Sequence, residues 1–112
     1  MNDWLDVCAV DDVPAPGARR LRVGGFTLAL IRPAGERVYA LEDRCPHKGG
    51  PLSEGIVSDD RVACPLHQRC VELATGAMVA PDEGQARTFS VRVEGSRVWL
   101  KRAELSEAAC TK

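Results

Sequence analysis

Apolar and polar residues alternate along much of the chain with the period of a β-strand. In residues 4–10, WLDVCAV, the apolar Leu5, Val7 and Ala9 fall on one face, and Asp6 and Cys8 fall on the other. Residues 88–93, TFSVRV, alternate in the same way near the other end of the chain. A period of two residues is typical of a strand with one buried face, so both segments are predicted to be strands.

Turn signals separate the predicted strands. Gly24-Gly25 joins residues 20–23 to residues 26–32, and Glu-Gly-Ser joins residues 88–93 to residues 97–101. Short links of this kind between apolar runs are typical of β-hairpins. A further strand is predicted over 36–43, after an Arg-Pro-Ala-Gly turn, although Leu41 is out of phase with its neighbours.

Two segments do not have the strand pattern. Residues 11–20 contain two prolines and a glycine and are expected to form a loop. No segment before residue 102 has a helical period, and the tail over 103–112 is expected to be a short helix or to fray. The predicted fold class is therefore all-β, a small antiparallel sandwich or barrel.

Residues 43–76 interrupt this pattern. Both ends of the segment are rich in Gly and Pro, and two short apolar pieces flank Ser58-Asp59-Asp60 in its middle, where a turn is expected. We therefore expect one domain over 1–112, with a small inserted subdomain at approximately 43–76 that presents two loops side by side.

Composition narrows the class of protein. The chain has 112 residues, of which 45% are hydrophobic and 28% charged, and this length suits one domain. A net charge of −1 argues against nucleic acid as a partner, and no apolar run approaches the roughly 20 residues of a membrane span. No secretory leader is visible, so a cytoplasmic, reducing location is expected, where clustered cysteines indicate metal or redox chemistry.

The candidate chemistry lies in two loops that each contain one Cys and one His. Cys45-x-His47 is followed, after 16 residues, by Cys64-x-x-His67, and these are the only two histidines of the chain. Four such ligands could hold one zinc ion, although zinc fingers usually take a Cys pair from one element and a His pair from another. Mixed loops favour an asymmetric [2Fe-2S] cluster, with two Cys on one iron and two His on the other. The remaining alternative is that they are ordinary core residues.

Neighbouring residues suit a buried cluster. Pro46 and Pro65 fix the backbone after each Cys, and Gly49-Gly50 would let N–H groups approach cluster sulfurs. Leu52 and Leu66 could form an apolar cover. Three further cysteines are expected to have other roles: Cys70 is a half-buried neighbour of the cluster, Cys8 a strand residue and Cys110 an exposed thiol.

The motifs CPHKGGPL and CPLH resemble the ligand motif of the Rieske iron–sulfur family. The stretches WLDVCAVDDVP, ALEDRCPHKGGPLSEG and PDEGQARTFSVRVEGSRVWL look, within that family, like small subunits of assimilatory NAD(P)H nitrite reductase. The resemblance implies a Rieske fold in which Cys45 and Cys64 ligate the buried iron and His47 and His67 the exposed one. It also implies that a loop containing Pro81 shields the cluster.

The resemblance implies a function in electron transfer. The partner would be a large subunit with sirohaem, FAD and an iron–sulfur centre, which reduces nitrite to ammonia in nitrate assimilation. The chain would then be part of an enzyme without a complete active site of its own. A free Rieske ferredoxin that serves an aromatic-ring oxygenase is the alternative, and a structural zinc module is a third.

Some positions depart from the family pattern. High-potential members have a disulfide between the loops, at positions that are Gly50 and Leu66 here, and hydroxyl donors where this chain has Arg69 and Val71. Fewer donors to the reduced cluster predict a potential near the low end of the Rieske range, roughly −150 mV. The aromatic pair that small subunits carry after the second His is also missing from this sequence.

Overall fold

A computed structural model describes residues 3–44, 50–65, 69–79 and 84–105. Within these ranges the chain forms strands β1 (Trp4–Ala9), β2 (Gly17–Val23), β3 (Phe26–Ala34), β4 (Arg37–Glu42), β5 (Ile56–Ser58), β6 (Arg61–Ala63), β7 (Cys70–Glu72), β8 (Thr88–Phe89), β9 (Val91–Glu94) and β10 (Arg97–Lys101), and the 3-10 turns η1 (Val10–Asp12) and η2 (Leu52–Glu54). The prediction of an all-β fold is confirmed.

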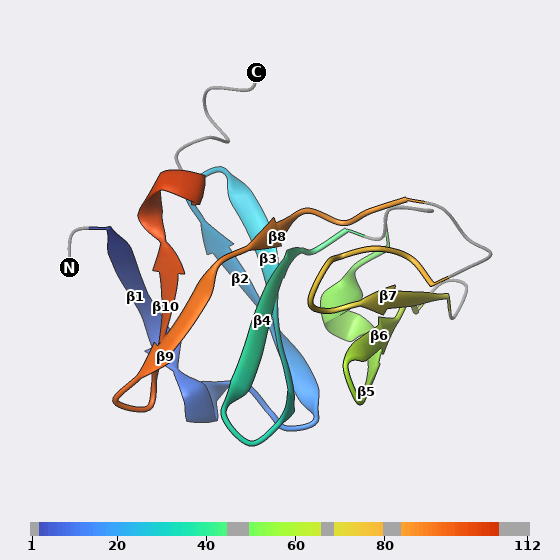
Figure 1. Ribbon diagram of the computed structural model, residues 1–112, viewed down its shortest axis with the longest axis horizontal. Coiled ribbons are helices and arrows are strands. Elements are labelled where there is room, and N and C mark those ends of the chain that lie inside the picture. Colours follow the sequence, from blue (N-terminus) through green and yellow to red (C-terminus); the bar gives the residue numbers. More distant parts are fainter. Residues whose placement is uncertain (1–2, 45–49, 66–68, 80–83, 106–112) are drawn as a thin grey trace.

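The strands form three antiparallel sheets, which lie next to one another in Figure 1. The outer sheet has the order β1-β10-β9, the central sheet β2-β3-β4-β8, and the small sheet β5-β6-β7. The sequence pattern predicts one strand over 88–93, but the structure has two. The chain changes sheets at Ser90, because β8 pairs with β4 while β9 pairs with β10.

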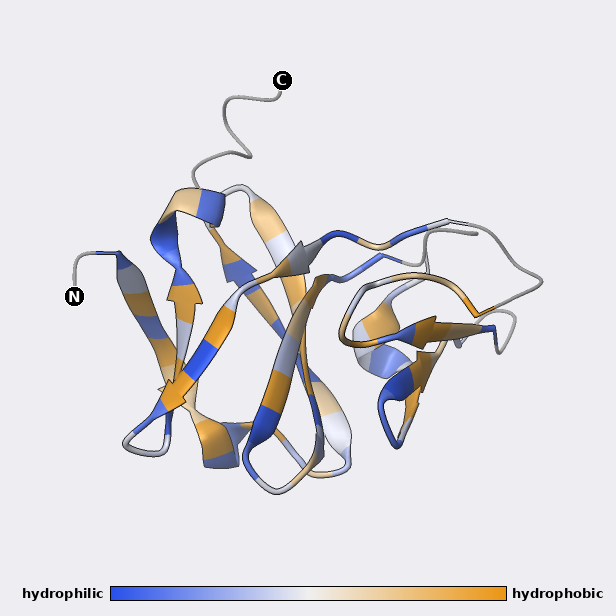
Figure 2. Cartoon of the chain, viewed as in Figure 1, coloured by the Kyte–Doolittle hydropathy of each residue, from blue (hydrophilic) through white to orange (hydrophobic). Residues whose placement is uncertain are grey.

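The central sheet is buried on both faces. Along β3, Leu28 and Leu30 belong to a first core between the central and outer sheets, whereas Ala29 and Ile31 belong to a second core shared with the small sheet. All four residues have no exposed surface. A continuous apolar run is typical of a strand that is covered on both sides, and this run is visible in Figure 2.

The second core also explains the irregular phase of β4. Val38 and Ala40 lie in the first core, and Leu41, on the opposite face, lies in the second. Leu41 is therefore out of phase only with respect to the first core. The pattern reflects a strand with two apolar environments.

The predicted hairpins are present, but β2 begins earlier than predicted and the β3–β4 pairing is irregular. Val23 pairs with Phe26 across Gly24-Gly25, and Glu94 pairs with Arg97. However, β2 begins at Gly17, inside the predicted loop, because its first residues pair with the end of β3. The register of β3 and β4 shifts between Ile31 and Ala34, around Pro33, which has no N–H to donate.

The predicted faces of β1 are wrong at Cys8. The pairing of β1 with β10 shifts between Asp6 and Cys8, so that one extra residue, Val7, is inserted in the strand. A bulge of this kind reverses the alternation beyond it. Cys8 is consequently 5% exposed and belongs to the first core, rather than to the polar face.

The small sheet continues the inserted segment. Its first hairpin, β5 to β6, turns at Asp59, as expected, with φ of 54°. The third strand, β7, lies in a region predicted to be turns. Its three residues pair with β6 and bury Val71 in the second core.

The start of the tail packs against the body of the protein. Residues 102–105 are helical, Leu105 is 6% exposed in the first core, and Glu104 accepts bonds from the N–H (2.7 Å) and Oγ (2.8 Å) of Ser90. The remainder of the tail, including Cys110, lies outside the described residues. Within the described part of the chain, no helix is long and apolar enough to cross a membrane.

The two cores predict different consequences for two neighbouring residues. Leu30→Ala and Ile31→Ala should each lower the free energy of unfolding by about 2–5 kcal/mol, because each leaves a cavity at a fully buried site. Ile31→Ala should also release the predicted metal faster, since its cavity opens in the core beneath the small sheet. Denaturant unfolding and chelator-induced metal loss measure the two effects. Equal rates of metal loss in variants of equal stability would contradict the assignment of separate cores.

Candidate metal centre

The structure describes one of the four predicted ligands. Cys64 follows β6 directly, has no exposed surface and belongs to the second core together with Leu52. Cys45, His47 and His67 lie outside the described residues, as do Leu66 and Pro81. The ligand set therefore remains a prediction, and the structure describes the backbone on either side of these positions.

The second ligand loop is closed at its base by the backbone. The N–H of Cys64 donates to the carbonyl of Arg69 (2.8 Å), and Ala63 pairs with Cys70 between β6 and β7. These contacts place the two ends of the loop together at one edge of the small sheet. The loop is thus a short excursion with Cys64 at its buried start.

The segment that contains Pro81 begins and ends beside the second ligand loop. The N–H of Met78 donates to the carbonyl of Gly84 (3.1 Å), which brings the two ends of this segment together. The N–H of Val79 donates to the carbonyl of Cys70 (3.0 Å), which joins it to the second loop. These bonds place the described ends of the segment beside the base of the second ligand loop, while the shielding role of Pro81 stays a prediction.

The end of the first ligand loop lies against the end of β6, next to the start of the second ligand loop. A Cβ on Gly55 would lie 2.1 Å from the carbonyl oxygen of Ala63, so only glycine allows this close backbone approach. Leu52, three residues earlier, is fully buried in the second core. The end of the first loop is therefore held against the residue that precedes Cys64.

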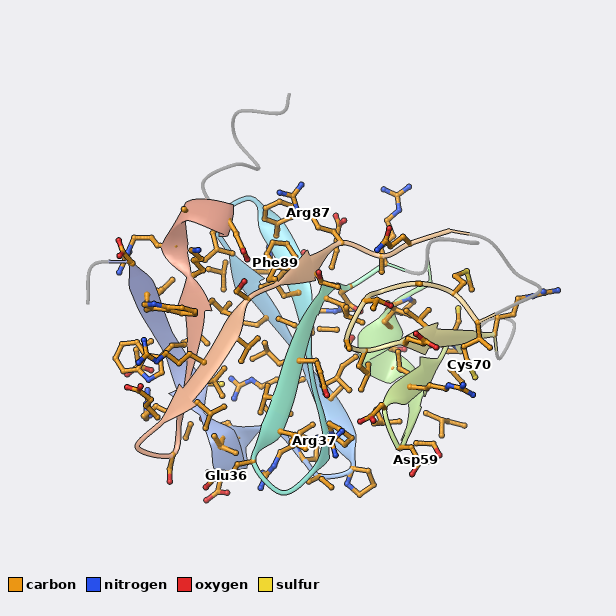
Figure 3. All side chains as sticks on the ribbon, in the orientation of Figure 1. Glu36, Arg37, Asp59, Cys70, Arg87 and Phe89 are labelled. Atoms are coloured by element: carbon orange, nitrogen blue, oxygen red, sulfur yellow. The ribbon has the colours of Figure 1, made fainter. Side chains whose placement is uncertain are left out.

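The other described cysteines have different environments. Cys8 lies in the first core, across the central sheet, where burial raises the pKa of its thiol and keeps it protonated. Cys70 is half-buried on β7, at the side of the molecule that carries the small sheet in Figure 3. No disulfide joins any of Cys8, Cys64 and Cys70. Of these three, only Cys64 is both fully enclosed and at a loop base.

The described residues fit an iron–sulfur cluster. A thiolate ligand at Cys64 would lie over apolar side chains, and the three loop bases converge around it. Val71, at a position where high-potential members have a hydroxyl donor, is fully buried and has no such group to offer, while Arg69 is exposed. The described arrangement is that of a cluster-binding β domain, with the apolar side chain of Val71 in the core beside Cys64.

The family follows from comparison with known proteins. The chain belongs to the Rieske-like [2Fe-2S] domain family, which matches residues 3–101. It is an electron-transfer domain with a Rieske [2Fe-2S] cluster as its cofactor, and the zinc alternative is set aside.

The sequence relatives of similar length include ferredoxin components of dioxygenase systems. A ferredoxin component of the naphthalene 1,2-dioxygenase/salicylate 5-hydroxylase systems of Ralstonia sp is 33% identical over 101 residues, which are 89% of this chain and 96% of the relative. A chain in a solved complex of reduced oxygenase and oxidized ferredoxin in carbazole 1,9a-dioxygenase is 35% identical, with a TM-score of 0.76 over 90% of this chain and 94% of that one.

One solved structure points to the other predicted function. A nitrite reductase NADPH small subunit is 27% identical, with a TM-score of 0.77, and the match covers 87% of this chain and 96% of that chain. The fold therefore accommodates both functions. A nitrite reductase small subunit is thus among the structural neighbours of this chain, whereas the sequence relatives named above are ferredoxin components.

 
Cys64→Ser should lose most of its iron and inorganic sulfide, because it removes a thiolate that the cluster needs. Cys70→Ser, the matched control on the neighbouring strand, should keep both. Iron and sulfide analysis of the two purified variants measures this. Equal retention of iron and sulfide would refute the assignment of Cys64 as a ligand.

Proposed function

We propose that this chain is a Rieske ferredoxin that delivers single electrons to the terminal component of an aromatic-ring oxygenase. The observation that carries the proposal is the 33% identity to a dioxygenase ferredoxin component over 96% of that protein's length. The missing aromatic pair after His67, a departure from nitrite reductase small subunits, favours the same assignment. The ferredoxin function is therefore preferred over that of a nitrite reductase small subunit, which the sequence motifs favour.

The architecture suits an electron carrier. The second ligand loop has its base at the small sheet and the first ligand loop ends beside it, whereas the outer sheet forms the opposite side of the molecule in Figure 1. When bound, the cluster supplies a site that accepts and releases one electron. The chain's own residues would hold that site: Cys64 from the buried side, and His47 and His67, as predicted ligands, from the side that a partner approaches.

The second candidate is the small subunit of an assimilatory nitrite reductase. It is favoured by the 27% identical small-subunit structure and by the terminal stretches noted in the sequence. In that case the chain would act as part of an enzyme, with a large sirohaem, FAD and iron–sulfur subunit as its partner. Both candidates are compatible with a cytoplasmic location.

The partner can be identified by reconstitution. We expect the reduced holoprotein to support turnover of an aromatic-ring oxygenase supplied with its reductase, at a rate that rises with ferredoxin concentration. A co-purification from the native host, followed by sirohaem and flavin analysis, tests the second candidate. Stable co-purification with a sirohaem flavoprotein, together with no electron delivery to the oxygenase, would overturn the first proposal.

The potential of the cluster is a separate prediction. We expect a midpoint of roughly −150 mV, because Val71 and Arg69 occupy positions where high-potential members have hydroxyl donors. A redox titration of the holoprotein, followed by its EPR signal, measures this value. A midpoint above zero would mean that other donors stabilise the reduced cluster.

A further inference from the structure

Asp43 is a buried carboxylate at the start of the first ligand loop. It follows β4 directly, lies two residues before Cys45 in the sequence, and its side chain is only 1% exposed. Burying a carboxylate is unfavourable unless hydrogen-bond donors or an opposite charge compensate it. The contacts of Asp43 therefore indicate what the residue does.

Three donors from two other elements surround this carboxylate. Oδ1 accepts from the N–H of Ser53 (2.7 Å), and Oδ2 accepts from Ser53 Oγ (2.7 Å) and from Arg20 Nε (2.9 Å). Ser53 lies in η2 and Arg20 in β2. The carboxylate thus ties the end of β4 to η2 and to the edge of the central sheet. Arg20, whose side chain is half exposed, supplies the opposite charge.

These bonds close the first ligand loop at its base. Asp43 and Ser53 are ten residues apart, and the segment between them contains Cys45 and His47. The base is itself fixed to the body of the protein, because the N–H of Asp43 donates to the carbonyl of Thr27 (2.8 Å) and Leu52 is buried in the second core. The side chain of Asp43 therefore closes the first ligand loop, whereas the backbone hydrogen bond between Cys64 and Arg69 closes the second.

We infer that Asp43 is a positioning residue for the cluster, whose carboxylate closes the loop that carries Cys45 and His47 onto Ser53, with Arg20 as the counter-charge. The inference rests on the family's cluster and not on the identity of the electron partner. It holds equally for an oxygenase ferredoxin and for a nitrite reductase subunit.

The opposite charges of Asp43 and Arg20 predict the direction in which each substitution shifts the midpoint potential of the cluster. A negative charge near the cluster disfavours the added electron, and a positive charge favours it. Arg20→Gln leaves the carboxylate uncompensated, so the midpoint potential should fall. Asp43→Asn removes the buried carboxylate and leaves Arg20 paired with the exposed Glu54 (3.9 Å from Nη2 to Oε2), so the charge near the loop becomes more positive and the potential should rise. A simple loosening of the fold gives no reason for opposite shifts.

The loop-closing role is tested by cluster retention. In the full-length holoprotein, Asp43→Ala should lose its cluster to a chelator about tenfold faster or more, since it removes charge-assisted hydrogen bonds at the loop base. Asp43→Asn should restore much of the retention, because its amide can still accept from the N–H of Ser53 and donate to Ser53 Oγ. Absorbance of the cluster follows the loss.

A similar pair in the outer sheet supplies the control. Arg97 Nη2 lies 2.9 Å from Asp6 Oδ1, between β10 and β1. Asp6→Asn and Arg97→Gln should leave both the potential and the rate of cluster loss close to those of the unmodified protein. Because these variants remove the same kinds of charge, they separate a local effect at the loop from a change in net charge.

Two results would overturn the inference. One is a potential that moves in the same direction, or not at all, in Arg20→Gln and Asp43→Asn. The other is an Asp43→Ala holoprotein that keeps its cluster as long as the unmodified protein. If Asp43→Ala does not fold, the shifts in midpoint potential of Arg20→Gln and Asp43→Asn decide whether the inference holds. Neither result depends on electron delivery to a partner, so failure here is distinguishable from failure of the proposed function.

Discussion

Burial of both faces of the β3–β4 hairpin is the constraint on which the rest of the structure depends. One face packs against the outer sheet through Leu28 and Leu30, and the other packs against the small sheet through Ala29 and Ile31. A chain of 112 residues has little apolar surface to bury. Because one hairpin is shared between two cores, both of its faces contribute to the buried surface. The small sheet, and with it Cys64, is thereby held to the body of the domain.

The two ligand loops are closed by different chemistry. The second is closed by a backbone bond between Cys64 and Arg69, and the first by the side chain of Asp43 on Ser53. A backbone closure is indifferent to side-chain identity, whereas a carboxylate brings a charge that needs Arg20. Positioning and electrostatics are therefore linked at the first loop, and separate at the second.

The sequence predicts the parts of this fold that rest on local rules. The all-β class, the hairpin at Gly24-Gly25 and the turn at Asp59 follow from period and turn chemistry. The burial of Cys8 could not be predicted in this way, because a bulge reverses the alternation of β1 before that residue. Strand β7 could not be predicted either, because its three residues form a strand only through pairing with β6. The role of Asp43 also depends on partners that are distant in the sequence. Of the four predicted ligands the structure describes Cys64, which is buried, and its place on the inner iron stays a prediction.

The central claim is that the paired Cys and His loops hold one mixed-ligand iron–sulfur cluster. An EPR spectrum of the dithionite-reduced protein, recorded with iron and sulfide determination on the same sample, tests it most directly. We expect two irons and two sulfides per chain, and a lower average g value than a cluster with four Cys ligands gives, because two imidazoles replace two thiolates on one iron. One zinc per chain with no EPR signal, or the g values of a four-Cys cluster, would contradict it.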